Sequence, residues 1–389
     1  TYSTVIESNG NNFEGGATVH NFNTVPEIPP IHYRDPVMGT PFQNDFGNGE
    51  ELKTTFYKNV GVFVKVSETN RTYITDTRLM SAMPAFRATK RSSSYINSAE
   101  TYNLSVYGIR SQWRYLSSES ETTYDQGAAN GSTVTTNYQY DNALHFQPTV
   151  ITTVLENAGS GTQHSFKTNM RYPQDYTFPG TLSGSAARIK GMVDKHIWNV
   201  PIEQLKSSIT GSVSRVVDGQ LSTYKLNGSF IVKDKDYALK FNNSTIYEDV
   251  ISVTPSTINS SGVFVYDSHY EQLNAYNRYD AVNNLLEAAD RKNTSGFIRE
   301  PNTGNVWAKV VNSTYSNVAY SSFEHGPGTT SAFTNWNYSI ANIISTSYQN
   351  GTRGFNLTGS SPITPVAALS SSQKYKISLW RKIGGSNLT

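Results

Sequence analysis

Apolar and polar residues alternate with a period of two along most of this chain. The clearest examples are the stretches 60–66, 132–138, 149–155 and 228–232, which are rich in Val, Ile, Thr, Phe and Tyr. Alternation in β-branched and aromatic residues predicts strands that turn one face toward a packed surface. We therefore expect β-strands at these four stretches.

Turn-forming residues separate the expected strands. Asp218-Gly219 and the clusters at 44–49, 129–131 and 158–161 combine Gly with Asn, Asp or Ser. Asn-Gly and Asp-Gly readily supply the positive φ angles of two-residue hairpin turns. Strands that recur every roughly 10–20 residues, without helices between them, predict an all-β, antiparallel fold.

Two segments depart from this pattern. Residues 185–196 place apolar side chains near helical spacing, and Pro201 follows, so a short helix is expected there. Segment 285–291 begins Leu-Leu-Glu-Ala-Ala, which propensity alone favours as a helix. A strand is the alternative for this segment, and it depends on the repeat described next.

The dipeptide Tyr-Asp recurs along the chain, at Tyr124-Asp125, Tyr140-Asp141, Tyr266-Asp267 and Tyr279-Asp280. Each pair can be interpreted as one hairpin, in which the Tyr ring stacks on the neighbouring hairpin and the Asp closes the turn by bonding the backbone. The fullest copy is Tyr279-Asp280-Ala281-Val282-Asn283-Asn284-Leu285-Leu286-Glu287, where turn residues lead into an apolar strand. Such hairpins gain their stability by stacking on one another.

Composition and charge narrow the functional classes. The formal net charge is only +2, from 32 basic and 30 acidic residues, so no nucleic-acid surface is indicated. Charged residues make up 16% of the chain, below the usual quarter, and Ser, Thr and Asn supply the polarity instead. This balance is typical of extracellular β proteins. The absence of cysteine favours a bacterial exported chain over a secreted eukaryotic one.

The start of the sequence and its longest apolar runs bear on the compartment. The chain begins at Thr1 rather than Met, so we expect an internal or mature fragment of a larger protein. No apolar run approaches the ~20 residues that span a bilayer, so no membrane-spanning segment is expected.

Candidate chemistry is sparse. The seven histidines are widely spaced and no thiol accompanies them, so neither a metal site nor a cofactor is expected. Asp234-Lys235-Asp236 and Glu248-Asp249 could supply calcium ligands or a catalytic carboxylate pair, with Asp234, Asp236 and Glu248 as the candidates, but a charged turn explains them more simply. Neither a G-x-S-x-G nucleophile elbow nor a phosphate-binding loop is present.

The chain resembles RHS/YD-repeat-like surface proteins of the Bacteroidetes over most of its length. Several pieces carry the resemblance in family order, namely 52–59, 113–116, 124–125, 140–142, 170–176, 192–197, 200–204, the Tyr279 unit and 319–324. The resemblance implies a large exported protein whose hairpins form an extended sheet or shell. Two departures are that Asn283-Asn284 replaces the usual Gly-Asn, and that no self-cleaving acidic motif is visible near the C-terminus. The second departure argues against toxin encapsulation.

The sequence changes character near residue 312, so we expect a YD-repeat-like scaffold at 1–311 and a second region at 312–389. The resemblance implies that the second region opens a β-sandwich like a carbohydrate-binding module, and it is shorter than a complete sandwich of ~100 residues. Trp336, Tyr338 and Trp380 are its candidate glycan-binding residues, because sugar rings stack on exposed aromatic side chains. The alternative is that these three residues belong to the sandwich core.

The resulting hypothesis is a non-catalytic structural section of a surface protein on the outside of a Gram-negative bacterium, serving as a scaffold or shell for adhesion or cargo. Its expected partners are the rest of its own chain, surface glycans, other cell-surface proteins or the export machinery, by analogy the type 9 secretion route. Two alternatives stay open: a glycan-binding adhesin module, and a polysaccharide-active enzyme on a β scaffold.

Overall fold

A computed structural model of the chain describes all residues except 1, 34, 43–45, 91–101, 126–130, 157–162, 242–251, 301–302, 325–334, 346–351, 358–361, 380, 384–385 and 389. By its contacts the chain divides into two compact units. Unit 1 comprises residues 1–176, 198–219 and 243–253, and unit 2 comprises 177–197, 220–242 and 254–389. The boundary expected near residue 312 stays a prediction.

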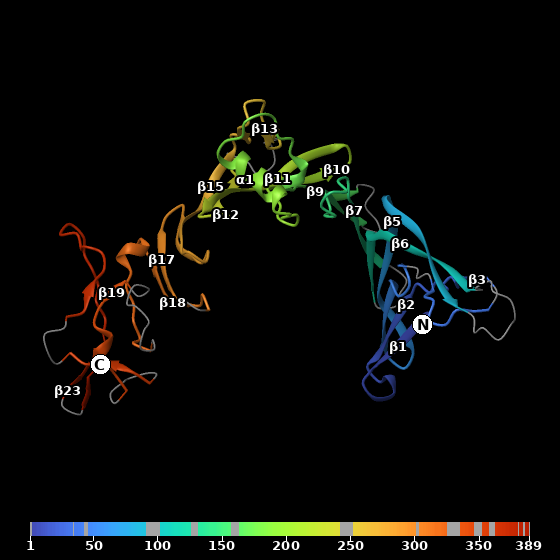
Figure 1. The fold of residues 1–389 in the computed structure, drawn as a ribbon, viewed down its shortest axis with the longest axis horizontal. Coiled ribbons are helices and arrows are strands. Elements are labelled where there is room, and N and C mark those ends of the chain that lie inside the picture. The colour runs from blue at the N-terminus through green and yellow to red at the C-terminus, as the bar shows by residue number, and fades with distance from the viewer. Residues whose placement is uncertain are drawn as a thin grey trace. The chain divides into compact units, whose positions relative to one another are not determined.

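The elements of unit 1 are mostly strands (Figure 1). They are β1 (Thr4–Asn9), β2 (Gly16–Phe22), β3 (Ile31–Tyr33), β4 (Glu51–Asn59), β5 (Phe63–Lys90), β6 (Tyr102–Tyr124), β7 (Gly131–Gln139), β8 (Val150–Glu156), β9 (His164–Arg171) and β10 (Glu203–Thr210). Two 3-10 turns, η1 (Asn11–Phe13) and η2 (Pro173–Asp175), complete it. Strand β11 (Val213–Asn227) begins in unit 1, and its residues 220–227 belong to unit 2.

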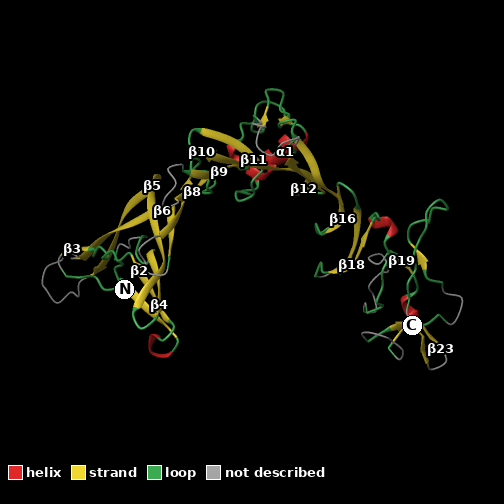
Figure 2. Cartoon of the chain, turned by 180° about the vertical axis from the view of Figure 1, so that it is seen from behind, coloured by secondary structure: helices red, strands yellow, loops and turns green. Residues whose placement is uncertain are grey.

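Unit 2 combines one helix with further strands, and Figure 2 shows strand in yellow and helix in red. Its longer elements are α1 (Gly184–Asp194), β12 (Phe230–Leu239), β15 (Tyr270–Tyr279), β16 (Leu285–Asp290), β17 (Thr294–Arg299) and β18 (Val306–Val311). Its short elements are β13 (Thr257–Ile258), β14 (Phe264–Val265), η3 (Tyr315–Asn317), β19 (Trp336–Asn337), η5 (Ile340–Asn342), β20 (Ile343–Ile344), β21 (Gly354–Phe355), β22 (Thr364–Pro365), β23 (Arg381–Ile383) and β24 (Ser386–Leu388).

The described strands pair mostly with their neighbours in sequence. In unit 1 the order is β1-β2-β4-β5-β6-β7-β8-β9-β10, with β3 added to β6, and in unit 2 it is β12-β15-β16-β17-β18. Every strand pair in these two series is antiparallel. The all-β, antiparallel prediction is therefore confirmed.

The side chains of strands β6 to β9 are mostly half-exposed, and the residues of β7 and β8 show no alternation of buried and exposed positions. A sheet packed on one side would bury every second residue. In unit 1 the buried core instead gathers around η2 and β10, where Tyr172, Tyr176 and Ile202 are at most 6% exposed. Strands β6 to β8 are thus held mainly by cross-strand contacts.

Helix α1 covers part of the sheet of unit 2. Its buried residues Ala186, Ile189 and Met192 recur at helical spacing, and the helix contacts β12 and β14. At its start the Ser183 amide donates to the Gly262 carbonyl at 3.1 Å. Gly262 has φ +72°, and a Cβ there would lie 2.0 Å from the Thr181 carbonyl oxygen, so only glycine fits.

Most predicted elements are confirmed, with shifted ends. The expected strands at 132–138 and 149–155 correspond to β7 and β8, the helix expected at 185–196 is α1, and 285–290 is strand β16 rather than helix. The stretches 60–66 and 228–232 are only partly strand, because Val60–Val62 and Gly228-Ser229 form turns. Gly61 and Gly228 have positive φ, which explains the turns.

One predicted turn is wrong. Asp218-Gly219 lies inside β11, and the chain turns at Gly211-Ser212 instead. Gly211 has φ +58°, whereas Gly219 is not among the glycines with positive φ. The turn cluster expected at 44–49 is confirmed only at 46–49, and the clusters at 129–130 and 158–161 lie outside the described residues.

Candidate functional site

The Tyr279 unit forms a hairpin turn between β15 and β16, with Tyr279 paired to Leu285. The Asp280 carboxylate holds this turn: Oδ1 accepts the amides of Val282 (2.9 Å) and Asn284 (2.8 Å), and Oδ2 accepts Asn284 Nδ2 at 2.9 Å. Asn283 adopts φ +70°, a conformation that Asn tolerates better than most residues. A side-chain acceptor therefore satisfies the amides that the turn leaves unpaired.

The same turn is tied to the neighbouring β11–β12 hairpin. Asn227, the last residue of β11, donates from Nδ2 to the Asp280 carbonyl (2.6 Å) and to Asn283 Oδ1 (2.8 Å). The Tyr279 hydroxyl donates to the Lys233 carbonyl at 2.8 Å, and the Lys225 ammonium lies 5.7 Å from the Tyr279 ring centre. Burial raises the pKa of the Tyr279 phenol to about 12, so the phenol remains a donor. One Tyr-Asp pair thus closes its own turn and contacts the next hairpin.

A carboxylate-aromatic network lies on the adjoining strands. Asp236 accepts hydrogen bonds from the Tyr276 hydroxyl (2.6 Å) and the Ser222 hydroxyl (2.8 Å), and Lys233 Nζ lies 2.8 Å from Asp236 Oδ1. Burial alone would raise the pKa of Asp236, but the bonds from Lys233, Tyr276 and Ser222 lower it. Asp234 pairs with Lys225 at 3.4 Å.

These contacts bear on the enzyme alternative. Both described carboxylates have cationic partners, and Glu248 lies outside the described residues. A general acid needs a raised pKa, whereas the pKa of Asp236 is lowered. The arrangement is that of cross-strand ion pairing, and catalysis by Asp234, Asp236 and Glu248 stays a hypothesis.

The Tyr140-Asp141 pair follows β7 and contacts the β5–β6 hairpin. The Tyr140 ring lies 5.2 Å from Trp113 and 4.3 Å from Tyr115, centre to centre. Asp141 Oδ2 accepts the Thr149 hydroxyl at 2.7 Å, across the loop that leads to β8. The guanidinium of Arg78 binds the carbonyls of both Tyr140 (2.6 Å) and Asp141 (2.7 Å).

The other two Tyr-Asp pairs also lie at strand ends. Asp267 precedes β15 and accepts the amides of Thr254 (2.8 Å) and His269 (2.9 Å), while the Tyr266 ring lies 5.2 Å from Tyr237. Tyr124 ends β6 opposite the first residue of β7, and Asp125 follows it directly. All four pairs therefore occupy the end of a strand or the turn beside it.

A buried polar cluster around His145 in unit 1 was not predicted from the sequence. His145 is 1% exposed, its Nδ1 accepts the Gln147 amide at 3.0 Å, and its Nε2 lies 3.2 Å from Asp175 Oδ1. The amide bond to Nδ1 places the proton of the neutral ring on Nε2, which donates to Asp175. Asp175 also accepts Asn142 Nδ2 and the Tyr172 amide, each at 2.8 Å. No motif marks these residues, because they lie 30 positions apart in sequence.

The pKa of the Asp175 carboxyl reflects this cluster. Burial would raise the pKa, but the hydrogen bonds from His145, the Tyr172 amide and Asn142 lower it. Asp175 therefore stays ionised and holds the loop at 142–147 against η2. Because His145 has almost no exposed surface, the cluster is suited to stabilising this loop rather than to acting on a substrate.

Polar ladders connect neighbouring strands of unit 1. Arg71 on β5 binds Glu51 on β4 at 2.6 Å and Glu119 on β6 at 2.8 Å. Threonine pairs bridge the next strands, with Thr122 and Thr133 hydroxyls 2.9 Å apart and Thr136 and Thr153 hydroxyls 3.4 Å apart. Such cross-strand pairs stabilise a sheet residue by residue.

The three candidate glycan-binding residues occupy different settings. Tyr338 is 7% exposed, and its ring packs against Phe323 (5.4 Å) and Phe355 (5.5 Å), so the structure places it in a local core. Trp336 lies half-buried in β19, and Trp380 lies outside the described residues. Glycan stacking stays a prediction. At Tyr338, a sugar ring would have to take the place of Phe323 or Phe355 against the tyrosine ring.

Two further properties hold for the residues that the structure describes. No group of three or more His, Asp or Glu residues among them could hold a metal ion. No helix formed by these residues is long and apolar enough to cross a membrane.

Comparisons with known proteins do not show a family for this chain. No protein-family model matches the chain, and no curated protein sequence matches it. A solved structure, the Tc holotoxin pore of Photorhabdus luminescens with a mutated TccC3, aligns with a TM-score of 0.42 and 8% identity. The alignment covers 76% of this chain and 17% of that chain. At this TM-score the likeness carries no argument about fold or function.

Proposed function

We propose that the chain is a non-catalytic structural section of an exported, RHS/YD-repeat-like surface protein. One observation carries the proposal: the Tyr279-Asp280 hairpin closes its own turn through Asp280 and binds the neighbouring hairpin through Tyr279 and Asn227. A unit that stabilises both itself and its neighbour is suited to building a continuous scaffold. The sequential strand order of the described sheet supports the same proposal.

The location and partners follow from the composition and the resemblance. A Ser-, Thr- and Asn-rich β chain without cysteine fits the outer surface of a Gram-negative bacterium. The partners proposed are the remainder of a larger chain and, through it, other surface proteins, glycans or cargo. The ion-paired state of Asp234 and Asp236 supports a role without catalysis.

Protease treatment of intact cells that produce the protein tests this proposal. The chain should be cleaved in intact cells as readily as in lysed cells, while a periplasmic marker survives only in the intact sample. In parallel, the purified chain and its Asp236→Asn variant should release no sugar from a polysaccharide panel. Protection of the chain in intact cells would refute the surface location, and turnover that Asp236→Asn abolishes would refute the absence of catalysis.

A further inference from the structure

The turn between β11 and β12 carries the dipeptide Asn227-Gly228. Asn227 is the last residue of β11 and pairs with Phe230, so Gly228 and Ser229 form a two-residue loop outside both strands. Gly228 has φ +59°, and no atom lies within 4 Å of the position that a Cβ would take there. Asn227 is half-buried and both loop residues are exposed, so water reaches this turn.

An asparagine followed by glycine is prone to deamidation, a reaction that needs only water. The backbone nitrogen of the glycine attacks the asparagine Cγ and gives up its proton, the bond from Cγ to Nδ2 breaks, and ammonia leaves. Water then opens the resulting cyclic imide to aspartate or isoaspartate. Glycine favours the attack because it has no side chain to shield its nitrogen and its backbone adopts more conformations than that of other residues.

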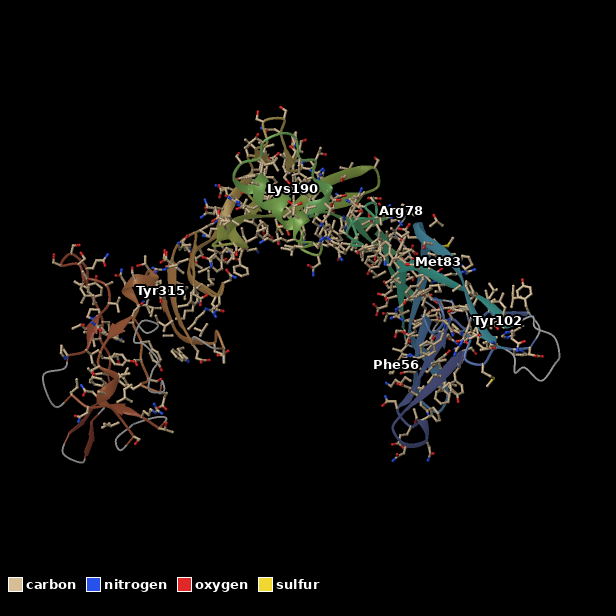
Figure 3. All side chains as sticks on the ribbon, viewed as in Figure 1. Phe56, Arg78, Met83, Tyr102, Lys190 and Tyr315 are labelled. Atoms are coloured by element: carbon tan, nitrogen blue, oxygen red, sulfur yellow. The ribbon has the colours of Figure 1, made fainter. Side chains whose placement is uncertain are left out.

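The neighbouring hairpin holds the amide group of Asn227 in this structure. Asn227 Nδ2 donates to the Asp280 carbonyl at 2.6 Å and to Asn283 Oδ1 at 2.8 Å, and we call these two hydrogen bonds the Asn227 clasp. The clasp uses both hydrogens of Nδ2, the nitrogen that deamidation releases. It therefore opposes the rotation that brings Cγ to the glycine nitrogen. Figure 3 shows the side chains of these hairpins between the labelled Lys190 on α1 and Tyr315 on η3.

The product of deamidation cannot form the clasp again. An ionised aspartate at position 227 has no hydrogen to donate, so it faces the two acceptors of the β15–β16 turn with a carboxylate. The side chain of Asp280 in that turn is a second carboxylate. The ammonium of Lys225 on β11 already pairs with Asp234 and binds the Tyr276 carbonyl. Because ammonia is lost, the change is permanent.

We propose that Asn227 is a site of spontaneous deamidation that the Asn227 clasp keeps closed, and that its conversion permanently separates the β11–β12 turn from the β15–β16 turn. The pairing of β12 with β15 at 235–239 does not involve the clasp and remains. The reaction occurs when the two turns part, so its rate measures how often they do so. The inference does not depend on the proposed surface function, because it uses only this contact and the chemistry of the dipeptide.

The chain contains its own reference site, Asn9-Gly10 at the end of β1. Both residues are exposed, and Gly10 has φ +84°. Incubation of the purified full chain in mildly alkaline buffer, followed by peptide mass spectrometry, measures both conversions in one sample. In the folded wild type, Asn9 should convert about tenfold faster than Asn227, which must first lose two hydrogen bonds. In concentrated urea the two rates should become alike.

Asn283→Gly tests whether the clasp controls the rate. The change removes the Oδ1 acceptor, and glycine keeps the positive φ of this position. Conversion of Asn227 should accelerate about fivefold, the worth of one hydrogen bond, while conversion of Asn9 stays the same. Asn293→Gly, the same substitution in the β16–β17 turn, should leave both rates as in the wild type.

Asn227→Asp tests the consequence, because it installs one product of the reaction. Hydrogen exchange at the 280–284 turn should accelerate about fivefold or more, since the clasp is lost. Exchange in β17 and β18 should match the wild type. Asn9→Asp, the same change at the reference site, should leave exchange at the 280–284 turn unchanged.

Three outcomes would overturn the proposal. Equal conversion of Asn9 and Asn227 in the folded wild type would show that the clasp does not protect the site. A wild-type rate at Asn227 in Asn283→Gly, or no conversion there while Asn9 converts fully, would show that opening of the clasp does not lead to deamidation. Unchanged exchange in Asn227→Asp would show that conversion does not separate the turns. Circular dichroism confirms that each variant compared is folded.

Discussion

Replacing Asp280 by Ala tests the role of the Tyr279 unit most sharply. The change removes an acceptor of three hydrogen bonds, two of them from the turn amides of Val282 and Asn284. Water can reach this half-exposed turn, so the cost resembles the loss of a helix N-cap, about 1–2 kcal/mol. Asp280→Asn keeps one carbonyl oxygen for the two amides and should cost about half as much.

Hydrogen exchange followed by mass spectrometry shows which segments of the chain lose stability in Asp280→Ala. A loss of about 1–2 kcal/mol speeds exchange through local opening about 5–30-fold in β15 and β16. Because Asn227 binds the same turn, a smaller acceleration should extend into the β11–β12 turn. Peptides from β6 to β9 should exchange as in the wild type.

The control is Asp218→Ala, which removes an exposed carboxylate from β11 and should change exchange little. Equal acceleration across the whole chain by Asp280→Ala would refute the reasoning, because it would mean that the hairpins unfold as one unit. No change at β15 and β16 would show that Asp280 does not hold the turn.

Three further predictions concern individual contacts. Asn283→Ala should destabilise the same turn by about 1–2 kcal/mol and Asn283→Gly by less, because Asn283 has positive φ; hydrogen exchange of β16 checks the order. Burial opposes ionisation of Glu68, but hydrogen bonds from Lys65 and Lys53 lower its pKa to about 2 from 4.5. Ionised Glu68 therefore adds its full share to the free energy of unfolding above about pH 4.5, and this share is lost as the pH falls toward 2. Urea unfolding should show this loss of stability in the wild type but not in Glu68→Gln. Asp175→Ala should destabilise unit 1 by about 2–3 kcal/mol, since it leaves His145 buried without its partner; unchanged urea unfolding would contradict this.

The sequence predicted the strands where local pattern and long-range packing agree. Stretch 132–138 is rich in β-branched residues and forms β7, which pairs with its sequence neighbours β6 and β8. Segment 285–290 has helical propensity, but the turn closed by Asp280 returns the chain beside β15 and makes it a strand. Local propensity is a weak preference, and such pairing outweighs it.

The sequence-based predictions were wrong or incomplete where contacts between residues distant in sequence decide the structure. Asp218-Gly219 has the composition of a turn, yet the chain remains extended there because the turn has already been made at Gly211. The pairing of β3 with β6 brings His32 beside Ser105, 73 positions away, and no periodic pattern encodes it. The His145–Asp175 pair and the bond from Arg78 to the Tyr140 carbonyl are equally non-local.

The central claim is that consecutive hairpins pair side by side in a fixed register, and disulfide trapping tests it most directly. Ser120 and Thr135 face each other across β6 and β7, with their hydroxyls 3.4 Å apart. In the cysteine-free chain, the double variant Ser120→Cys/Thr135→Cys should form an intramolecular disulfide in high yield on mild oxidation. Glu119→Cys/Thr135→Cys, which is displaced by one residue and therefore points to opposite faces, should remain reduced. Preferential oxidation of this displaced pair, or failure of both pairs, would contradict the account.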